Sequence, residues 1–163
     1  MKVIEKILAK LAESKSVKVR IRVAGCRLTP EKITVKLAGD PVCGVRVASA
    51  QNPKASVDAF RKLLADEIPL VREELAWNKN IPEFIRDELS DDKDREVRMA
   101  VCATEKKNIK RLIKLSNEPD PFVRTAVANN ERTPIDILDK LENDPSVGVR
   151  ETAARTKRIV TDM

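Results

Sequence analysis

Six arginines occupy equivalent places in this chain of 163 residues, each after a valine and each 26 residues from the next. An acidic residue recurs six positions before the last five of them. The two sets are Arg20, Arg46, Arg72, Arg98, Arg124 and Arg150, and Asp40, Asp66, Asp92, Glu118 and Asp144. Because a guanidinium and a carboxylate form paired, charge-assisted hydrogen bonds, this spacing predicts an ion-pair ladder between adjacent layers of a repeated structure. The alternative is an exposed row of arginines that binds phosphate or an acidic peptide.

Few residues in the chain are suited to catalysis. Histidine is absent, which excludes an imidazole base, a zinc–histidine site and a Ser-His or Cys-His pair. The motifs GxGxxG, GK[ST] and GxSxG are also missing. The acidic run from Glu83 to Glu96 lacks the spacing of a calcium-binding loop, and Cys26, Cys43 and Cys102 include no CxxC pair. We therefore expect no enzyme activity, no cofactor and no metal site.

The arginines belong to a longer repeat that must position them. Five residues after each valine of the Val-Arg pair stands alanine or cysteine, and 18 residues after the first five valines stands leucine. These columns are Ala24, Ala50, Ala76, Cys102, Ala128 and Ala154, and Leu37, Leu63, Leu89, Leu115 and Leu141. Apolar residues three and four apart are typical of amphipathic helices. Each unit thus predicts two short helices, a VR-helix through Val-Arg and a TP-helix after Thr29-Pro30 or Thr133-Pro134.

Helices this short are not stable alone in water, so we expect them to stack around one continuous core. The predicted fold is all-α, an α-solenoid (superhelix) of six 26-residue two-helix repeats, forming a single helical-repeat domain over residues 1–163. The expected helix pairs cover about residues 1–26, 27–52, 53–78, 79–104, 105–130 and 131–163. Ile4, Ile7, Leu8 and Leu11 fit the apolar columns of a first TP-helix.

Prolines and asparagines predict where the helices begin and end. Asp40-Pro41 and Asp144-Pro145 would place a capping carboxylate and a first helical proline at the start of a VR-helix, and the Thr-Pro pairs would do so for a TP-helix. The expected ends of three VR-helices carry an asparagine, which tolerates the left-handed conformation common there. These asparagines are Asn52, Asn78 and Asn130.

The repeat resembles two known families. The string D-P-x-x-x-V-R-x-x-A/V-A, as in Asp144 to Ala154, is similar to the second helix of HEAT repeats, which also carry a stacked Asp–Arg ladder. The continuation from Val127 to Leu141 looks more like the leucine-rich repeat variant family. This resemblance implies binding and scaffolding, seldom catalysis. Some members of the variant family carry an N-terminal cysteine cluster for an iron–sulfur centre, but that region here has only Cys26 and Cys43, too few for a cluster.

The outward face of the VR-helices is the expected partner surface. With the valine as position 0, positions 2 and 6 should point outward, and the resemblance to HEAT repeats implies that they line a concave surface. The partner-binding candidates are Val47, Gln51, Trp77 and Met99. Trp is enriched at interface hot spots, whereas the alternative is that Trp77 folds back over the core. We expect a monomeric, non-enzymatic scaffold that binds an unknown protein or peptide partner.

Charge suggests a second partner class. Residues 1–82 contain 16 Lys and Arg against 9 Asp and Glu, and residues 83–163 contain 16 against 17, so the basic character lies in the N-terminal half. The alternative function is nucleic-acid binding, which some HEAT-like glycosylases achieve in this way, through Arg22, Arg27, Lys36, Lys54, Arg61 and Lys62. A glycosylase-like enzyme using Trp77 and a carboxylate is a further alternative. No apolar stretch is long enough to span a bilayer, so we expect no membrane partner. The odd number of cysteines, none in a CxxC pair, favours a reduced, cytoplasmic protein.

Overall fold

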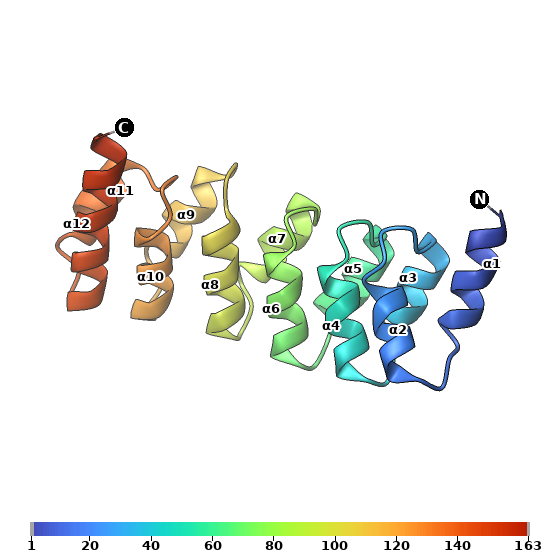
Figure 1. Ribbon diagram of the computed structural model, residues 1–163. Helices are drawn as coiled ribbons and strands as arrows, with labels where there is room; N and C mark the ends of the chain where they lie inside the picture. Colours follow the sequence, from blue (N-terminus) through green and yellow to red (C-terminus); the bar gives the residue numbers. More distant parts are fainter. Residues whose placement is uncertain (1, 163) are drawn as a thin grey trace. The chain divides into compact units, whose positions relative to one another are not determined.

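The chain is built of helices. A computed structural model describes residues 2–162, which contain twelve helices and no strand (Figure 1). The prediction of an all-α helical repeat is confirmed. The chain divides into two compact units, one ending at Leu89 and one beginning at Ser90. None of the helices within residues 2–162 combines the length and the apolar character that crossing a bilayer requires.

The first unit contains seven helices: α1 (Lys2–Leu11), α2 (Val17–Ala24), α3 (Glu31–Leu37), α4 (Cys43–Gln51), α5 (Val57–Leu64), α6 (Pro69–Trp77) and α7 (Glu83–Leu89). The VR-helices α2, α4 and α6 pack side by side in one layer, and the TP-helices α3, α5 and α7 form a second layer behind it (Figure 1). This two-layer arrangement leaves one face of each VR-helix open to solvent.

The second unit contains five helices: α8 (Arg95–Thr104), α9 (Ile109–Leu115), α10 (Pro121–Ala128), α11 (Ile135–Leu141) and α12 (Val147–Thr161). Its VR-helices α8, α10 and α12 again pack in sequence, and α9 and α11 are its TP-helices.

The core includes most of the columns that the repeat predicted. In the first unit Val45, Val71, Ala50 and Ala76 of the VR-helices are fully buried, as is Leu63 of the TP-helices. The same columns are buried in the second unit, at Val97, Val123, Val149, Cys102, Leu115 and Leu141. Burying small residues on the VR-helices allows neighbouring helices to approach closely, which explains why alanine recurs there.

The predicted capping positions are wrong by one or two residues. The VR-helices α4 and α12 have Val42 and Ser146 as N-caps, so Asp40 and Asp144 lie ahead of the helix and accept from these caps' N–H groups. At the TP-helices the proline is itself the N-cap, and Thr29 and Thr133 donate instead to the carbonyls of Val23 and Val127. The arrangement of cap then proline does occur, at Asp120-Pro121 of α10.

The asparagines at the VR-helix ends do not adopt the left-handed conformation, because no non-glycine residue within 2–162 has positive φ. Their side chains instead tie adjacent layers together. Asn52 Nδ2 donates to the carbonyls of Ala24 and Cys26, one layer earlier, at 2.7 and 3.0 Å. Its Oδ1 accepts from Lys54 N–H. Asn78 and Asn130 make the same kind of bonds, so the residue type serves inter-layer hydrogen bonding.

Before α9, where Lys107-Asn108 stands in place of Thr-Pro, a buried glutamate organises the start of the TP-helix. Glu105 accepts from the backbone N–H groups of Lys106, Lys107 and Asn108, each at 2.9 Å, and pairs with the buried Arg111. Burial alone would raise the pKa of Glu105, but these N–H groups and Arg111 outweigh it and hold the pKa below its usual value. The helix α9 of the second unit thus forms without a Thr-Pro pair at its start.

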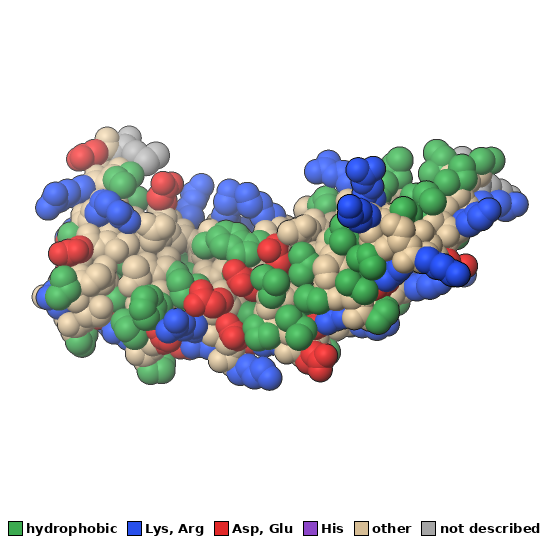
Figure 2. All heavy atoms as spheres, turned by 60° about the horizontal axis from the view of Figure 1, so that its bottom comes forward, with side chains coloured by type: hydrophobic (Ala, Val, Ile, Leu, Met, Phe, Trp, Pro, Cys, Tyr) green, Lys and Arg blue, Asp and Glu red, His purple; other side chains and the backbone are tan. Residues whose placement is uncertain are grey.

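The apolar face of α1 is largely open, contrary to its match with the buried columns. Leu8 packs against the core of the first unit, whereas Ile4, Ile7 and Leu11 are exposed. Figure 2 shows hydrophobic side chains gathered over this helix. The helix α1 packs on α2, and its other apolar side chains have water as their neighbour.

Candidate binding surface

The repeated spacing of arginines and acidic residues produces the predicted ladder. Arg20 pairs with Asp40, Arg46 with Asp66 and Arg124 with Asp144, in each case through Nε and Nη2 to the two carboxylate oxygens. The distances lie between 2.6 and 3.1 Å, and each arginine side chain is only 13 or 14% exposed. These guanidinium groups are engaged in the structure and do not form an exposed row.

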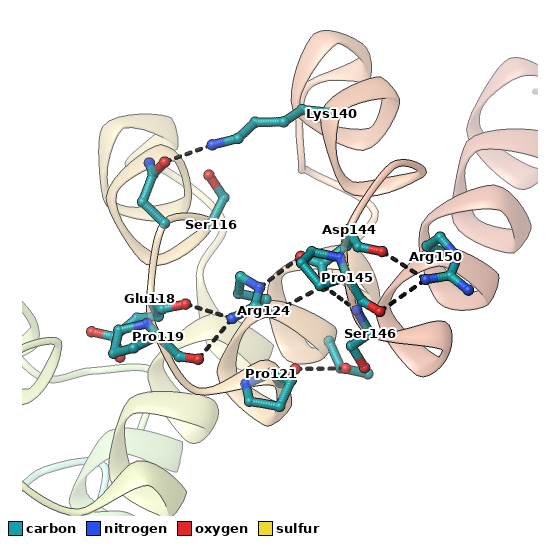
Figure 3. Close-up of polar contacts among 12 residues, drawn as sticks. Ser116, Glu118, Pro119, Pro121, Arg124, Lys140, Asp144, Pro145, Ser146 and Arg150 are labelled. Atoms are coloured by element: carbon teal, nitrogen blue, oxygen red, sulfur yellow. Dashed lines mark hydrogen bonds and ion pairs between the residues drawn. The ribbon is translucent and has the colours of Figure 1, made fainter.

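Asp40 and Asp144 of the ladder each hold two arginines. Asp144 accepts from Arg124 with its carboxylate, and its backbone carbonyl accepts from Arg150 Nη1 at 2.8 Å (Figure 3). Asp40 does the same with Arg20 and Arg46. The side chain therefore points back to one layer while the main chain points forward to the next, which fixes the spacing of the layers.

The ladder carboxylates are held in their charged form. Hydrogen bonds from Arg124 keep the pKa of Asp144 below its usual value, against the opposing effect of burial. For Asp40 burial is the largest effect and would raise the pKa, but the bonds from Arg20 and Val42 N–H outweigh it and lower the pKa. These groups are structural, because their charge is neutralised within the stack.

Glu118 is the exception in this ladder. It meets Arg98 through one bond, from Nη2 to Oε2 at 3.2 Å. Among residues 2–162, Arg98 Nε is a buried donor with no hydrogen-bond partner. The longer glutamate side chain reaches the outer nitrogen of the guanidinium and leaves the inner one unpaired.

The open face of the VR-helices carries the candidate partner residues. Positions −1, 2, 3 and 6 relative to the valine form one stripe on each helix, which we call the outer face. In the first unit it comprises Lys18, Ile21 and Arg22 of α2 with its C-cap Gly25, Gly44, Val47 and Gln51 of α4, and Leu70, Glu73, Glu74 and Trp77 of α6. Ala48, at position 3 of α4, is buried in the core. Position 6 is exposed in every VR-helix, as predicted, and position 2 is partly buried in all but α12.

Trp77 is exposed, as the sequence predicted. Its side chain is 48% exposed, and its Nε1 lies 3.5 Å from Glu73 Oε1 on the same helix. Leu70, one heptad earlier on α6, is equally exposed. The sequence interpretation missed Leu70 because it considered positions 2 and 6 alone, although the seven-residue spacing from Trp77 places both on one face.

The neighbouring helix α4 joins this surface through Gln51. Its Nε2 donates to Glu74 Oε2 of α6 at 2.9 Å. Val47, one turn earlier, is partly buried. Three of the four predicted partner residues, Val47, Gln51 and Trp77, thus lie on the outer face of one compact unit.

The fourth predicted residue belongs to the other unit. Met99 is partly buried on the outer face of α8. The outer face of α10 in that unit carries Phe122, exposed and stacked under Arg95 with the guanidinium 4.6 Å from the ring centre. The sequence interpretation missed Phe122, which occupies position −1 as Leu70 does. In Figure 2 exposed hydrophobic side chains lie among charged ones over the VR-helices.

The basic residues proposed for nucleic acid come from three parts of the first unit. Arg22 is on the outer face of α2, Arg27 and Lys54 are in the loops that follow α2 and α4, and the others are on TP-helices. These others are Lys36 of α3 and Arg61 and Lys62 of α5, and all six are exposed. Lys36 pairs with Glu13 and Arg61 with Asp58. The six side chains therefore do not form one continuous stripe.

No cysteine or carboxylate cluster suited to a metal occurs within residues 2–162. Cys102 is buried in α8, and Cys26 and Cys43 are partly buried in the first unit. Cys26 and Cys43 alone supply too few thiolates for an iron–sulfur cluster, which uses four. The residues present do not fit such a group.

Comparison with known proteins identifies the fold. Neither a family model nor a curated protein matches the chain. Among solved structures, a leucine-rich repeat variant described as having a novel repetitive structural motif is 26% identical and covers 93% of this chain, with a TM-score of 0.69. The chain spans 60% of the length of that protein. The chain is therefore a helical-repeat protein with the fold of the leucine-rich repeat variant.

Proposed function

We propose that this protein is a non-enzymatic scaffold that binds a protein or peptide on the outer face of α2, α4 and α6. The observation that carries the proposal is the exposure of Trp77 beside the equally exposed Leu70. Indole and leucine side chains that face water favour burial in a partner, because removing apolar area from water is favourable. Tryptophan is also the residue type most enriched at interface hot spots.

The repeat itself does not require a tryptophan at this position. The other VR-helices carry Gly25, Gln51, Ala103, Asn129 and Arg155 there, and all are exposed. A large aromatic side chain at a position that tolerates glycine contributes little to the stack. Its presence on α6 is consistent with a role outside the fold. The partly buried Val47 and the exposed Gln51 of the neighbouring helix α4 belong to the same outer face.

Protein or peptide binding is favoured over nucleic-acid binding. Stacking of bases needs exposed aromatic rings near the cations. Phe60 of α5 is buried, and the exposed Phe84 already lies under the Arg61 guanidinium, which is 5.3 Å from its ring centre. The distribution of the six basic residues over three parts of the unit further disfavours a backbone-tracking groove. Nucleic acid nevertheless makes a distinct, testable second candidate because residues 1–82 are basic.

The test is an affinity capture from source lysate, with and without nuclease treatment, using the unmodified chain, Trp77→Ser and Phe84→Ser. Phe84 is the matched control, since it is an exposed aromatic of the same unit on the TP-helix α7. We expect a partner that Trp77→Ser loses and Phe84→Ser keeps, and whose purified form shifts Trp77 fluorescence. Capture that is equal for all three proteins, or that nuclease abolishes, contradicts the proposal.

A further inference from the structure

We propose that the outer face of the first unit selects a partner segment with separated charges: acidic residues at one end, an apolar residue in the middle and basic residues at the other. This inference rests on the proposed function and specifies the partner's chemistry. It follows from the order of charge across three adjacent helices, which is basic on α2, uncharged on α4 and acidic on α6.

The helix α2 supplies the basic end. Lys18 and Arg22 stand one turn apart, are both exposed, and form no ion pair within residues 2–162. Together with Val19 and Ile21 they line a hollow of about 450 Å³ whose walls are nearly all apolar. A carboxylate-bearing residue with an apolar neighbour matches this environment, because the cations lie at the rim of an apolar surface.

The helix α4 supplies an uncharged centre with small side chains. Its outward positions are Gly44 and Val47, both partly buried, whereas Ala48 belongs to the buried core. A Cβ atom on Gly44 would meet Ile21 Cδ1 at 3.6 Å, an ordinary contact, so the stack itself does not require glycine there. Glycine destabilises a helix relative to alanine. Its presence leaves room at the centre of the face for an incoming side chain.

The helix α6 supplies the acidic end. Glu73 and Glu74 are partly buried beside Leu70 and Trp77, and within residues 2–162 neither pairs with a lysine or arginine. Their hydrogen bonds are to neutral groups, Trp77 Nε1 and Gln51 Nε2. A partner lysine or arginine would therefore find two uncompensated carboxylates next to an aromatic ring, a favourable place for a cation.

The spacing sets the length of the segment. Packed helices lie about 8–10 Å apart, so crossing from α2 to α6 takes about 16–20 Å, or about six residues of extended chain. Complementary charges at both ends favour one orientation, because the reversed segment would place like charges together. The face should therefore select both the sign and the separation of the partner's charges.

The experiment is selection of random ten-residue peptides, displayed on phage, against the unmodified protein and two charge variants. The unmodified protein should enrich peptides in which acidic and basic residues stand about five positions apart with an apolar residue between them. The order from acidic to basic along the chain should be the same in all of these peptides. Lys18→Glu with Arg22→Glu makes both ends of the face acidic and should enrich peptides basic at both ends. Glu73→Lys with Glu74→Lys should enrich peptides acidic at both ends.

Synthetic versions of the enriched peptides then locate the site. Trp77→Ser should weaken binding at least tenfold, and Gly44→Leu should do so by filling the centre of the face. Gly148→Leu is the matched control, because Gly148 holds the same position on α12 and a Cβ there meets only Ser146 Oγ at 4.0 Å. Circular dichroism confirms that each variant is folded.

The outcomes separate the two proposals. In one outcome the enriched peptides need Trp77 and Gly44 for binding and yet show no order of charges, and in another they show the same order with all three proteins. Either result overturns the inference and leaves the proposed function standing. If no peptide is enriched, or if the enriched peptides bind equally to Trp77→Ser, the face is not a peptide site and both proposals fail.

Discussion

At the scale of single residues, the ladder shows how one methylene changes an ion pair. Asp40, Asp66 and Asp144 each accept two bonds from an arginine, whereas Glu118 accepts one and leaves Arg98 Nε unpaired. A buried donor without a partner costs about 1–3 kcal/mol. The longer acid is therefore the weaker member of the ladder, although its charge is the same.

Glu118→Asp should accordingly stabilise the protein by about 1 kcal/mol, because the shorter side chain matches the two-bond geometry of the other pairs. The measurement is the midpoint of urea unfolding at neutral pH. Asp144→Glu is the reciprocal control and should destabilise by a similar amount. A lower midpoint for Glu118→Asp would mean that the backbone before α10 cannot bring an aspartate to Arg98.

Cys102 illustrates how burial governs a side chain's reactivity. Burial, with a smaller effect from the nearby Glu118, raises the pKa of its thiol to about 12. Since the thiolate is the reactive form, a disulfide reagent at pH 8 should label Cys26 and Cys43 in the native protein and Cys102 only after unfolding. The Cys102→Ala variant should lose one reactive thiol in denaturant and none in the native state. Loss of a natively reactive thiol would contradict this burial.

At the scale of helices, the columns of Val, Ala and Leu predicted where the helices lie and, except at α1, which face is buried. The predicted caps were wrong because Asp40 and Thr29 bind other groups. The Asp40 carboxylate pairs with Arg20, and the Thr29 hydroxyl donates to the Val23 carbonyl. The spacing in the sequence cannot rank such partners. For the site, the exposed Trp77 was predictable from the column around it. The charge order across α2, α4 and α6 became visible only when the helices were placed side by side.

The ladder that joins these helices should fail in acid. The pKa of Asp144 is lower in the folded state than in the unfolded chain, so the unfolded state binds more protons as the pH falls. The stabilisation is complete above the unfolded value of about 3.9 and is lost as the pH falls through the lower folded value. Thermal melts from pH 7 to pH 2 should show a steep fall for the unmodified protein.

Asp144→Asn removes this titrating group and serves as the comparison. Its melting temperature should be lower at pH 7, with a smaller further decrease in acid. The control Asp136→Asn changes an exposed aspartate of α11 and should keep the steep fall. If Asp144→Asn is as acid-sensitive as the unmodified chain, the ladder does not determine acid stability.

At the scale of the whole molecule, the net charge of +6 is concentrated in residues 1–82. A cationic surface attracts any polyanion, so some binding to nucleic acid is expected without a specific site. Affinity that arises from phosphate contacts falls with salt, by about one unit of log–log slope for each contact.

Binding to a labelled 20-base-pair duplex or a single strand should therefore be weak and should disappear near physiological salt. Fluorescence anisotropy across a salt titration measures this. Arg27→Ala with Lys54→Ala, two exposed loop cations, should reduce the slope slightly and affect both probes equally. Tight binding that persists at physiological salt, or a strong preference for one probe, would favour the nucleic-acid function over the scaffold.

The polar bonds between layers all join nearby parts of the chain. Ladder partners are 20 residues apart, and the asparagines reach carbonyls 25 to 28 residues away. Topologies with such local contacts fold quickly. During synthesis, at about 5–20 residues per second, the next layer would leave the ribosome within a few seconds of the one before it. We expect each new layer of the nascent chain to pack on the one before it while translation continues. Only a small part of the apolar core would then be exposed to water at any one time.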